Sequence, residues 1–67
     1  MLKAAVIGVG SIGQNHARVY RDLDGVQLVG VADAFPATAA KIGNRLNVPF
    51  YSDIDKMLDE QKPDLVS

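Results

Sequence analysis

The feature that most constrains this chain is a glycine pattern near its N-terminus, in which Gly8, Gly10 and Gly13 follow an apolar run over residues 4–7. When a β-strand enters a helix through Gly-x-Gly-x-x-Gly, the first glycine permits a tight turn and the third permits close packing of helix and strand. The second lets a pyrophosphate group approach the backbone. N–H groups at the helix start and the positive end of the helix dipole then face the anion. The pattern therefore predicts a strand, a phosphate-binding turn and a helix.

The residues around the glycines also agree with a dinucleotide-binding unit. Residues 2–7 are apolar apart from Lys3 and carry no turn residue, as in a buried parallel strand. From Ile12 a helical face runs through His16, Val19 and Leu23, at spacings of three and four. A second apolar run, Val26–Ala32, ends in Asp33. An acidic residue about 20 positions beyond the glycines binds the hydroxyls of the adenosine ribose. We predict that the cofactor-binding residues are Gly8, Gly10, Ser11, Ile12, Gly13 and Asp33.

Asp33 favours NAD over NADP, because a carboxylate accepts both ribose hydroxyls and repels a 2′-phosphate. No arginine follows it directly, since Ala-Phe-Pro occupies residues 34–36, although Lys41 and Arg45 lie further along the chain. Two alternatives stay open. Asp33 could serve only as a helix cap or turn residue, and Ser11 could be only a helix N-cap rather than a phosphate ligand.

The rest of the chain continues an alternation of strands and helices. A packed or hydrogen-bonded structural histidine is expected at His16, on the inner face of the first helix. A third helix is expected to begin with a capping-box variant formed by Ser52 and Asp55. The order β-α-β-α-β-α-β predicts an α/β fold, a partial Rossmann-type doubly wound parallel sheet whose last strand is incomplete. The expected elements are strands at Leu2–Ile7, Val26–Ala32, 48–51 and 63–67, and helices at about Ser11–Asp22, about Pro36–Leu46 and from residue 52.

Composition excludes several classes of function. A chain of 67 residues makes one domain at most, and its 48% hydrophobic content argues against disorder. With no cysteine and one histidine, it offers no thiol nucleophile, disulfide or Cys/His metal site. A net charge of −1, from scattered side chains, provides no basic surface for nucleic acid. No apolar run is long enough for a membrane span, and no signal-peptide pattern is present. We therefore expect a cytoplasmic protein without nucleic-acid or membrane partners.

Taken together, these residues resemble the N-terminus of the Gfo/Idh/MocA oxidoreductases, the relatives of glucose-fructose oxidoreductase and inositol 2-dehydrogenase. The resemblance covers essentially the whole chain. It is carried by residues 5–13 with His16, by Val-Ala-Asp at 31–33, by Val-Pro at 48–49 and by Lys-Pro-Asp-Leu-Val-Ser at 62–67.

This resemblance implies a nicotinamide-dependent hydride transfer on a sugar, a polyol or a related hydroxyl or carbonyl compound. Such proteins add a C-terminal substrate domain, a catalytic lysine in a Glu-Lys-Pro motif and an aspartate-histidine pair, none of which is present here. Lys62-Pro63 is not that motif, because Gln61 stands in the glutamate position and the dipeptide precedes the fourth strand. Lys62 is instead expected to be a cation at a helix end or in a loop. We expect residues 1–67 to be the N-terminal portion of the dinucleotide-binding domain, binding the ADP half of NAD without catalysis.

A different class of function stays open beside this one. A sheet of three or four strands has an unpaired edge and exposed apolar faces, so the chain could be a stand-alone structural module that forms homo-oligomers. A third alternative, a flavin- or S-adenosylmethionine-binding Rossmann relative, uses a similar glycine turn and acidic residue.

Overall fold

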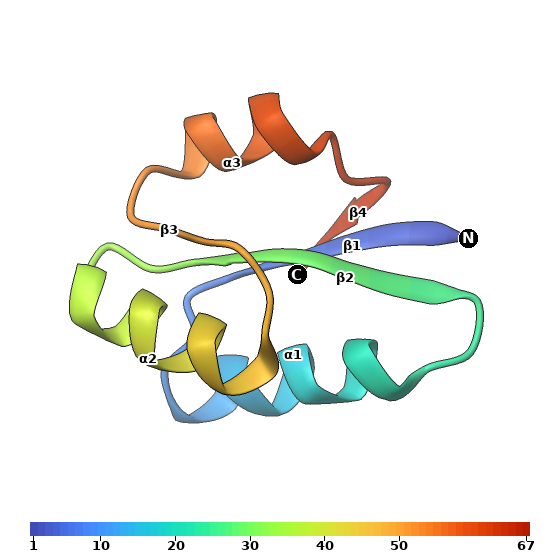
Figure 1. Ribbon diagram of the computed structural model, residues 1–67, viewed down its shortest axis with the longest axis horizontal. Helices are drawn as coiled ribbons and strands as arrows, with labels where there is room; N and C mark the ends of the chain where they lie inside the picture. Colours follow the sequence, from blue (N-terminus) through green and yellow to red (C-terminus); the bar gives the residue numbers. More distant parts are fainter.

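The computed structural model is a parallel four-stranded sheet with helices on both faces (Figure 1). It describes the backbone of residues 1–67, and side chains for residues 1–10, 13 and 15–67. No helix in the described part of the chain has the length and apolar character needed to span a bilayer. The elements in chain order are β1 (Leu2–Ile7), α1 (Ser11–Asp22), β2 (Val26–Ala32), α2 (Pro36–Leu46), β3 (Phe50–Tyr51), α3 (Ile54–Gln61) and β4 (Leu65–Val66).

The strand order is β3-β2-β1-β4, so the chain changes direction across the sheet after β3. From β1 it moves outward through α1 to β2 and through α2 to β3. It then returns through α3 to β4, which pairs with the free side of β1. Because parallel crossovers are right-handed, this reversal places α3 on the face opposite α1 and α2 (Figure 1). The partial Rossmann fold predicted from the sequence is confirmed.

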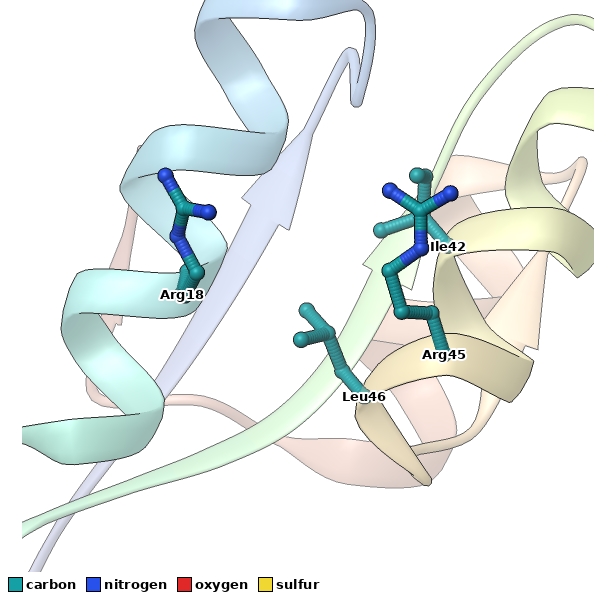
Figure 2. A pocket seen from close by; sticks show the side chains of 4 residues that line it. All are labelled: Arg18, Ile42, Arg45 and Leu46. Carbon is teal, nitrogen blue, oxygen red and sulfur yellow. The ribbon is translucent and has the colours of Figure 1, made fainter.

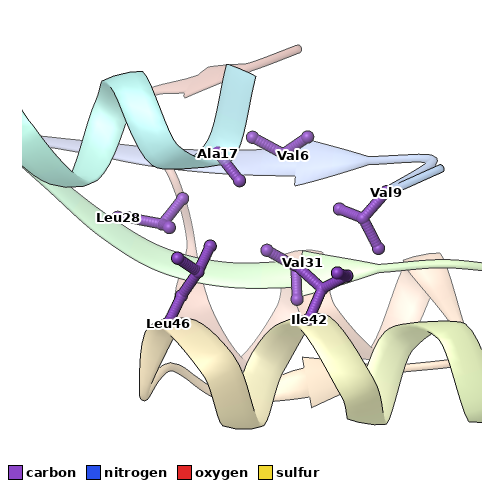
Figure 3. Packing of buried hydrophobic residues seen from close by; sticks show 7 residues of the cluster. All are labelled: Val6, Val9, Ala17, Leu28, Val31, Ile42 and Leu46. Carbon is purple, nitrogen blue, oxygen red and sulfur yellow. The ribbon is translucent and has the colours of Figure 1, made fainter. Parts of the chain in front are cut away.

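The sheet is buried on both faces because helices cover both, and successive strand residues point to opposite faces. Ala5 and Ala32 face α3, where they form a small cluster with Met57. Val6 and Val31, their neighbours in sequence, belong to the larger cluster between the sheet and the other two helices (Figure 3). This larger cluster consists of Val6, Val9, Ala17, Leu28, Val31, Ile42 and Leu46. The packed helices thereby hold the carboxyl ends of β1 and β2 in fixed positions.

The third strand is shorter than expected, because the predicted strand at 48–51 is paired only at Phe50–Tyr51. The preceding residues end α2 instead. Asn47 has a left-handed backbone with φ 57°, and the Val48 N–H donates to the Gly43 carbonyl at 3.0 Å. Such a bond satisfies a helix-end carbonyl and delays the start of the strand.

The expected capping box at Ser52 and Asp55 is wrong, because Asp53 is the N-cap of α3. Its side chain accepts a hydrogen bond from the Lys56 N–H at 3.2 Å. Either residue has the chemistry of a cap. Which of the two residues caps α3 is decided by the path of the backbone between β3 and α3.

Candidate cofactor site

Gly8 begins the turn at the carboxyl end of β1. It has φ +79°, the left-handed region that favours glycine. Its N–H donates to the Ala32 carbonyl at 2.8 Å, so the pairing of β1 with β2 continues into the turn. The turn is therefore tied to the end of β2.

Gly13 lies in the first turn of α1, directly against the backbone of Gly8. A Cβ at this position would collide with the Gly8 carbonyl oxygen and would lie 2.7 Å from its carbonyl carbon. Real Cβ atoms essentially never approach other heavy atoms within 3.0 Å. The close packing expected of the third glycine is therefore present.

Gly10 precedes α1 as its N-cap residue, with φ −69° and ψ −160°. It is exposed, and a Cβ built there would meet no described atom within 4 Å. A glycine N-cap supplies no side-chain acceptor, and a helix leaves its first N–H groups without partners in the helix itself. The side-chain position of Gly10, at the end of the turn, is thus open.

Asp33 follows β2 and lies beside this turn. One carboxylate oxygen, Oδ2, accepts a hydrogen bond from the Val9 N–H at 3.0 Å, and Oδ1 accepts from the Phe35 N–H at 2.9 Å. The Asp33 N–H donates to the Tyr51 carbonyl at 3.0 Å. The half-buried carboxylate is therefore held between the glycine turn and the turn that leads into α2.

A hollow of about 240 Å³ lies at the carboxyl ends of β1 and β4. This is the point where strand order reverses, and ligands of open α/β sheets bind at such points. Ligand pockets usually measure about 300–1,000 Å³, so the hollow can hold only part of a dinucleotide. It is lined by Val6, Ile7, Gly8, Gly13, His16 and Ser67.

His16 is exposed, which contradicts the expected position on the inner face of α1 and the packed form of the structural histidine. It lines this hollow and also an open depression of about 340 Å³ on α1, formed with Asn15, Val19 and Tyr20. The helical spacing of His16 predicts an inner-face position. Its exposure depends on which elements pack over that side of α1, and this is a tertiary property.

A third pocket lies between α1 and α2, where Arg18 and Arg45 flank Ile42 and Leu46 (Figure 2). Its volume of about 30 Å³ is about the space that one water molecule occupies in the liquid. Although it carries two guanidinium groups, it is too small for a nucleotide. We therefore place the candidate cofactor site at the glycine turn.

The structure brings together the four predicted site residues that it describes fully, namely Gly8, Gly10, Gly13 and Asp33. The side chains of Ser11 and Ile12, also predicted, lie outside the described residues. Lys62 is the C-cap of α3 with φ 45°, which confirms the expectation of a cation at a helix end.

The backbone N–H groups of Val9 and Phe35 were missed as partners of Asp33. No side-chain pattern reveals such a role, because every residue except proline carries an N–H. Phe35 itself is 73% exposed, so its side chain gives no sign of the contact that its N–H makes.

Comparison with known proteins agrees with this geometry. The model of the oxidoreductase family with an NAD-binding Rossmann fold, Gfo/Idh/MocA, matches residues 2–67. D-apiose dehydrogenase from Paraburkholderia graminis is 32% identical over 65 residues, which are 96% of this chain and 17% of that protein.

Two solved structures have the same arrangement of strands and helices. UDP-N-acetylglucosamine 3-dehydrogenase from Acidithiobacillus ferrooxidans is 34% identical with a TM-score of 0.85, over 97% of this chain and 20% of that one. GenD2 from gentamicin A biosynthesis, in complex with NAD, is 26% identical with a TM-score of 0.89, over 97% and 19%. This chain thus spans at most one fifth of each of these three relatives. Because the family model matches nearly all of its residues, the chain belongs to the Gfo/Idh/MocA family of oxidoreductases with an NAD-binding Rossmann fold.

Proposed function

We propose that this chain binds the ADP half of NAD at the glycine turn, as part of an oxidoreductase that acts on a sugar, a polyol or a related hydroxyl or carbonyl compound. NAD, when bound, supplies the hydride acceptor or donor. The residues of this chain bind and orient the cofactor and do not themselves transfer a hydride.

The observation that carries the proposal is the environment of Gly10. Gly8 and Gly13 have reasons to be glycine within the chain itself, a positive φ and a close backbone contact. Gly10 has neither, since its φ of −69° suits any residue and its Cβ position is free of every described atom within 4 Å. A group that approaches the backbone from outside accounts for the missing side chain, and a pyrophosphate at a helix start is such a group.

Asp33 supplies the second part of the proposal. A carboxylate has about four acceptor positions, and the Val9 and Phe35 N–H groups use one on each oxygen. The remaining positions can accept the 2′- and 3′-hydroxyls of the adenosine ribose. A 2′-phosphate would place negative charge against the carboxylate, so NAD should bind more tightly than NADP.

The substrate class is proposed from the relatives. D-apiose dehydrogenase and UDP-N-acetylglucosamine 3-dehydrogenase are named for sugar or sugar-nucleotide substrates. A hydroxyl or carbonyl group of a sugar or polyol is therefore the proposed site of oxidation or reduction in the whole protein.

Calorimetric titration of the chain with NAD, ADP-ribose and NADP tests the binding proposal. We expect NAD and ADP-ribose to bind comparably and NADP at least several-fold more weakly. Asp33→Ala should abolish the preference. The matched control is Asp24→Ala, which removes an exposed acid from the turn before β2, at the opposite end of that strand. Absence of NAD binding by a folded chain, or equal affinities for NAD and NADP, would contradict the proposal.

A second candidate function, assembly through the sheet edge, is favoured by exposed apolar side chains on the two edge strands. Val66 on β4 and Phe50 on β3 are 46% and 44% exposed. An edge strand with apolar neighbours can pair with another copy of the chain. Sedimentation tests this candidate, because a folded monomer at micromolar concentration would rule it out.

A further inference from the structure

Asp33 makes two hydrogen bonds that the proposed recognition of ribose does not require. Its carboxylate accepts the Val9 N–H from the glycine turn and the Phe35 N–H from the β2–α2 turn, at 3.0 and 2.9 Å. Val9 and Asp33 are 24 residues apart in the sequence. A single side chain thus joins the two turns that border the candidate site.

We propose that Asp33 is a positioning residue that holds both turns in their binding shape before any cofactor arrives. The proposal deepens the proposed function and rests on it only for the identity of the site. In this role, the acid organises the pyrophosphate-binding backbone as well as the ribose-binding side.

The burial of Val9 explains why this contact has a structural effect. Its side chain is 0% exposed and packs in the larger core cluster (Figure 3), so the residue cannot turn its N–H toward water without leaving the core. A buried N–H without an acceptor is costly. With the side chain held by the core and the N–H held by Asp33, the peptide between Gly8 and Val9 has one orientation. That orientation directs the chain toward Gly10.

The contact at Phe35 acts on the other turn in the same way. The carboxylate accepts a hydrogen bond from the N–H two residues further on, which is a typical Asx-turn and a strong local constraint. Because Asp33 itself donates its N–H to the Tyr51 carbonyl, its backbone is anchored to β3. The carboxylate therefore connects a fixed sheet edge to both turns.

Two acceptor oxygens are essential to this arrangement. Asparagine at this position keeps one oxygen and would turn an NH₂ group toward a backbone N–H, so it can retain only one of the two bonds. Alanine retains neither. We therefore expect Asp33→Asn to lose one of the two hydrogen bonds and Asp33→Ala to lose both.

Amide hydrogen exchange measured by NMR on the chain without cofactor tests the proposal. The reference amides are Gly8, bonded to the Ala32 carbonyl, and Val31, bonded to the Pro49 carbonyl. Relative to these, we expect the Val9 and Phe35 amides to exchange at least about tenfold faster in Asp33→Ala. In Asp33→Asn only one of the two should accelerate, and in the Asp24→Asn control neither.

Unchanged exchange at Val9 and Phe35 in Asp33→Ala, with the reference amides still protected, would overturn the proposal. If the reference amides also lose protection in the variant, the contact is tested in the unaltered chain instead. A through-hydrogen-bond coupling between the Val9 amide nitrogen and the Asp33 carboxyl carbon supports the contact, and its absence refutes it. Since no measurement uses NAD, failure of cofactor binding and failure of this proposal are separate results.

Discussion

Replacement of Gly13 by alanine should destabilise this chain by about 2 kcal/mol. The added Cβ would collide with the Gly8 carbonyl oxygen, and the Gly8 N–H bond to Ala32 prevents the turn from moving away easily. Overpacking of this kind costs about 1–3 kcal/mol. Against it stands a gain of about 1 kcal/mol, because alanine is a better helix former than glycine. A backbone contact that cannot yield places the overpacking cost at its upper end, so the collision should dominate.

The matched substitution is Gly10→Ala in the same turn. Its Cβ meets no described atom within 4 Å, and its φ of −69° is ordinary for alanine. Reduced freedom of the unfolded chain stabilises by about 0.4–1 kcal/mol, and the poorer N-cap offsets this gain. We expect the free energy of unfolding to change by no more than about 0.5 kcal/mol. Binding of NAD should nevertheless fall at least tenfold, or about 1.4 kcal/mol, because the methyl group occupies the proposed path of the pyrophosphate.

Thermal unfolding followed by circular dichroism, with calorimetric titration of NAD and ADP-ribose, separates the two effects. A loss of 2 kcal/mol lowers Tm by roughly 8–16 °C in a domain of this size. The reasoning would be refuted if Gly10→Ala unfolded as easily as Gly13→Ala, or if it bound NAD as tightly as the parent chain. An unchanged Tm for Gly13→Ala would contradict the close packing of α1 on the turn.

Three further substitutions test the packing and the site. Met57→Ala removes a side chain that is 0% exposed between α3 and the sheet, and should lower the free energy of unfolding in urea by about 2–5 kcal/mol. Tyr51→Phe deletes a hydroxyl that donates to Glu60 at 2.9 Å and accepts from Gln61 at 2.8 Å. It should cost about 0.5–1.5 kcal/mol in the same assay, and a larger loss would mean that the hydroxyl is more than a surface link. Phe35→Ala trims a ring that is 73% exposed, so stability should change by less than about 0.5 kcal/mol. Because Phe35 follows the proposed ribose-binding Asp33 by two residues, the affinity for ADP-ribose should fall severalfold in that variant. An unchanged affinity would mean that the ring does not contact the adenosine.

Much of this structure follows from local sequence. The strands Leu2–Ile7 and Val26–Ala32 and the helices Ser11–Asp22 and Pro36–Leu46 have the bounds that apolar periodicity and turn residues predict. The glycine turn is also local, because a positive φ at Gly8 is a property of one residue. At the shorter elements, the local residue pattern did not predict the correct bounds and caps. Neighbouring residues compete there, and Asp53 rather than Ser52 caps α3.

Tertiary structure decided where these pieces meet. Nothing local places β4 beside β1, or exposes His16 at the hollow where strand order reverses. The contact of Asp33 with the Val9 N–H likewise depends on the pairing of β1 with β2. Local sequence is sufficient to predict the strand, turn, helix and acid of the candidate nucleotide site, because periodicity and glycine act over a few residues. The carboxylate that joins two turns arises only in the folded sheet, because its hydrogen bonds connect segments that strand pairing brings together.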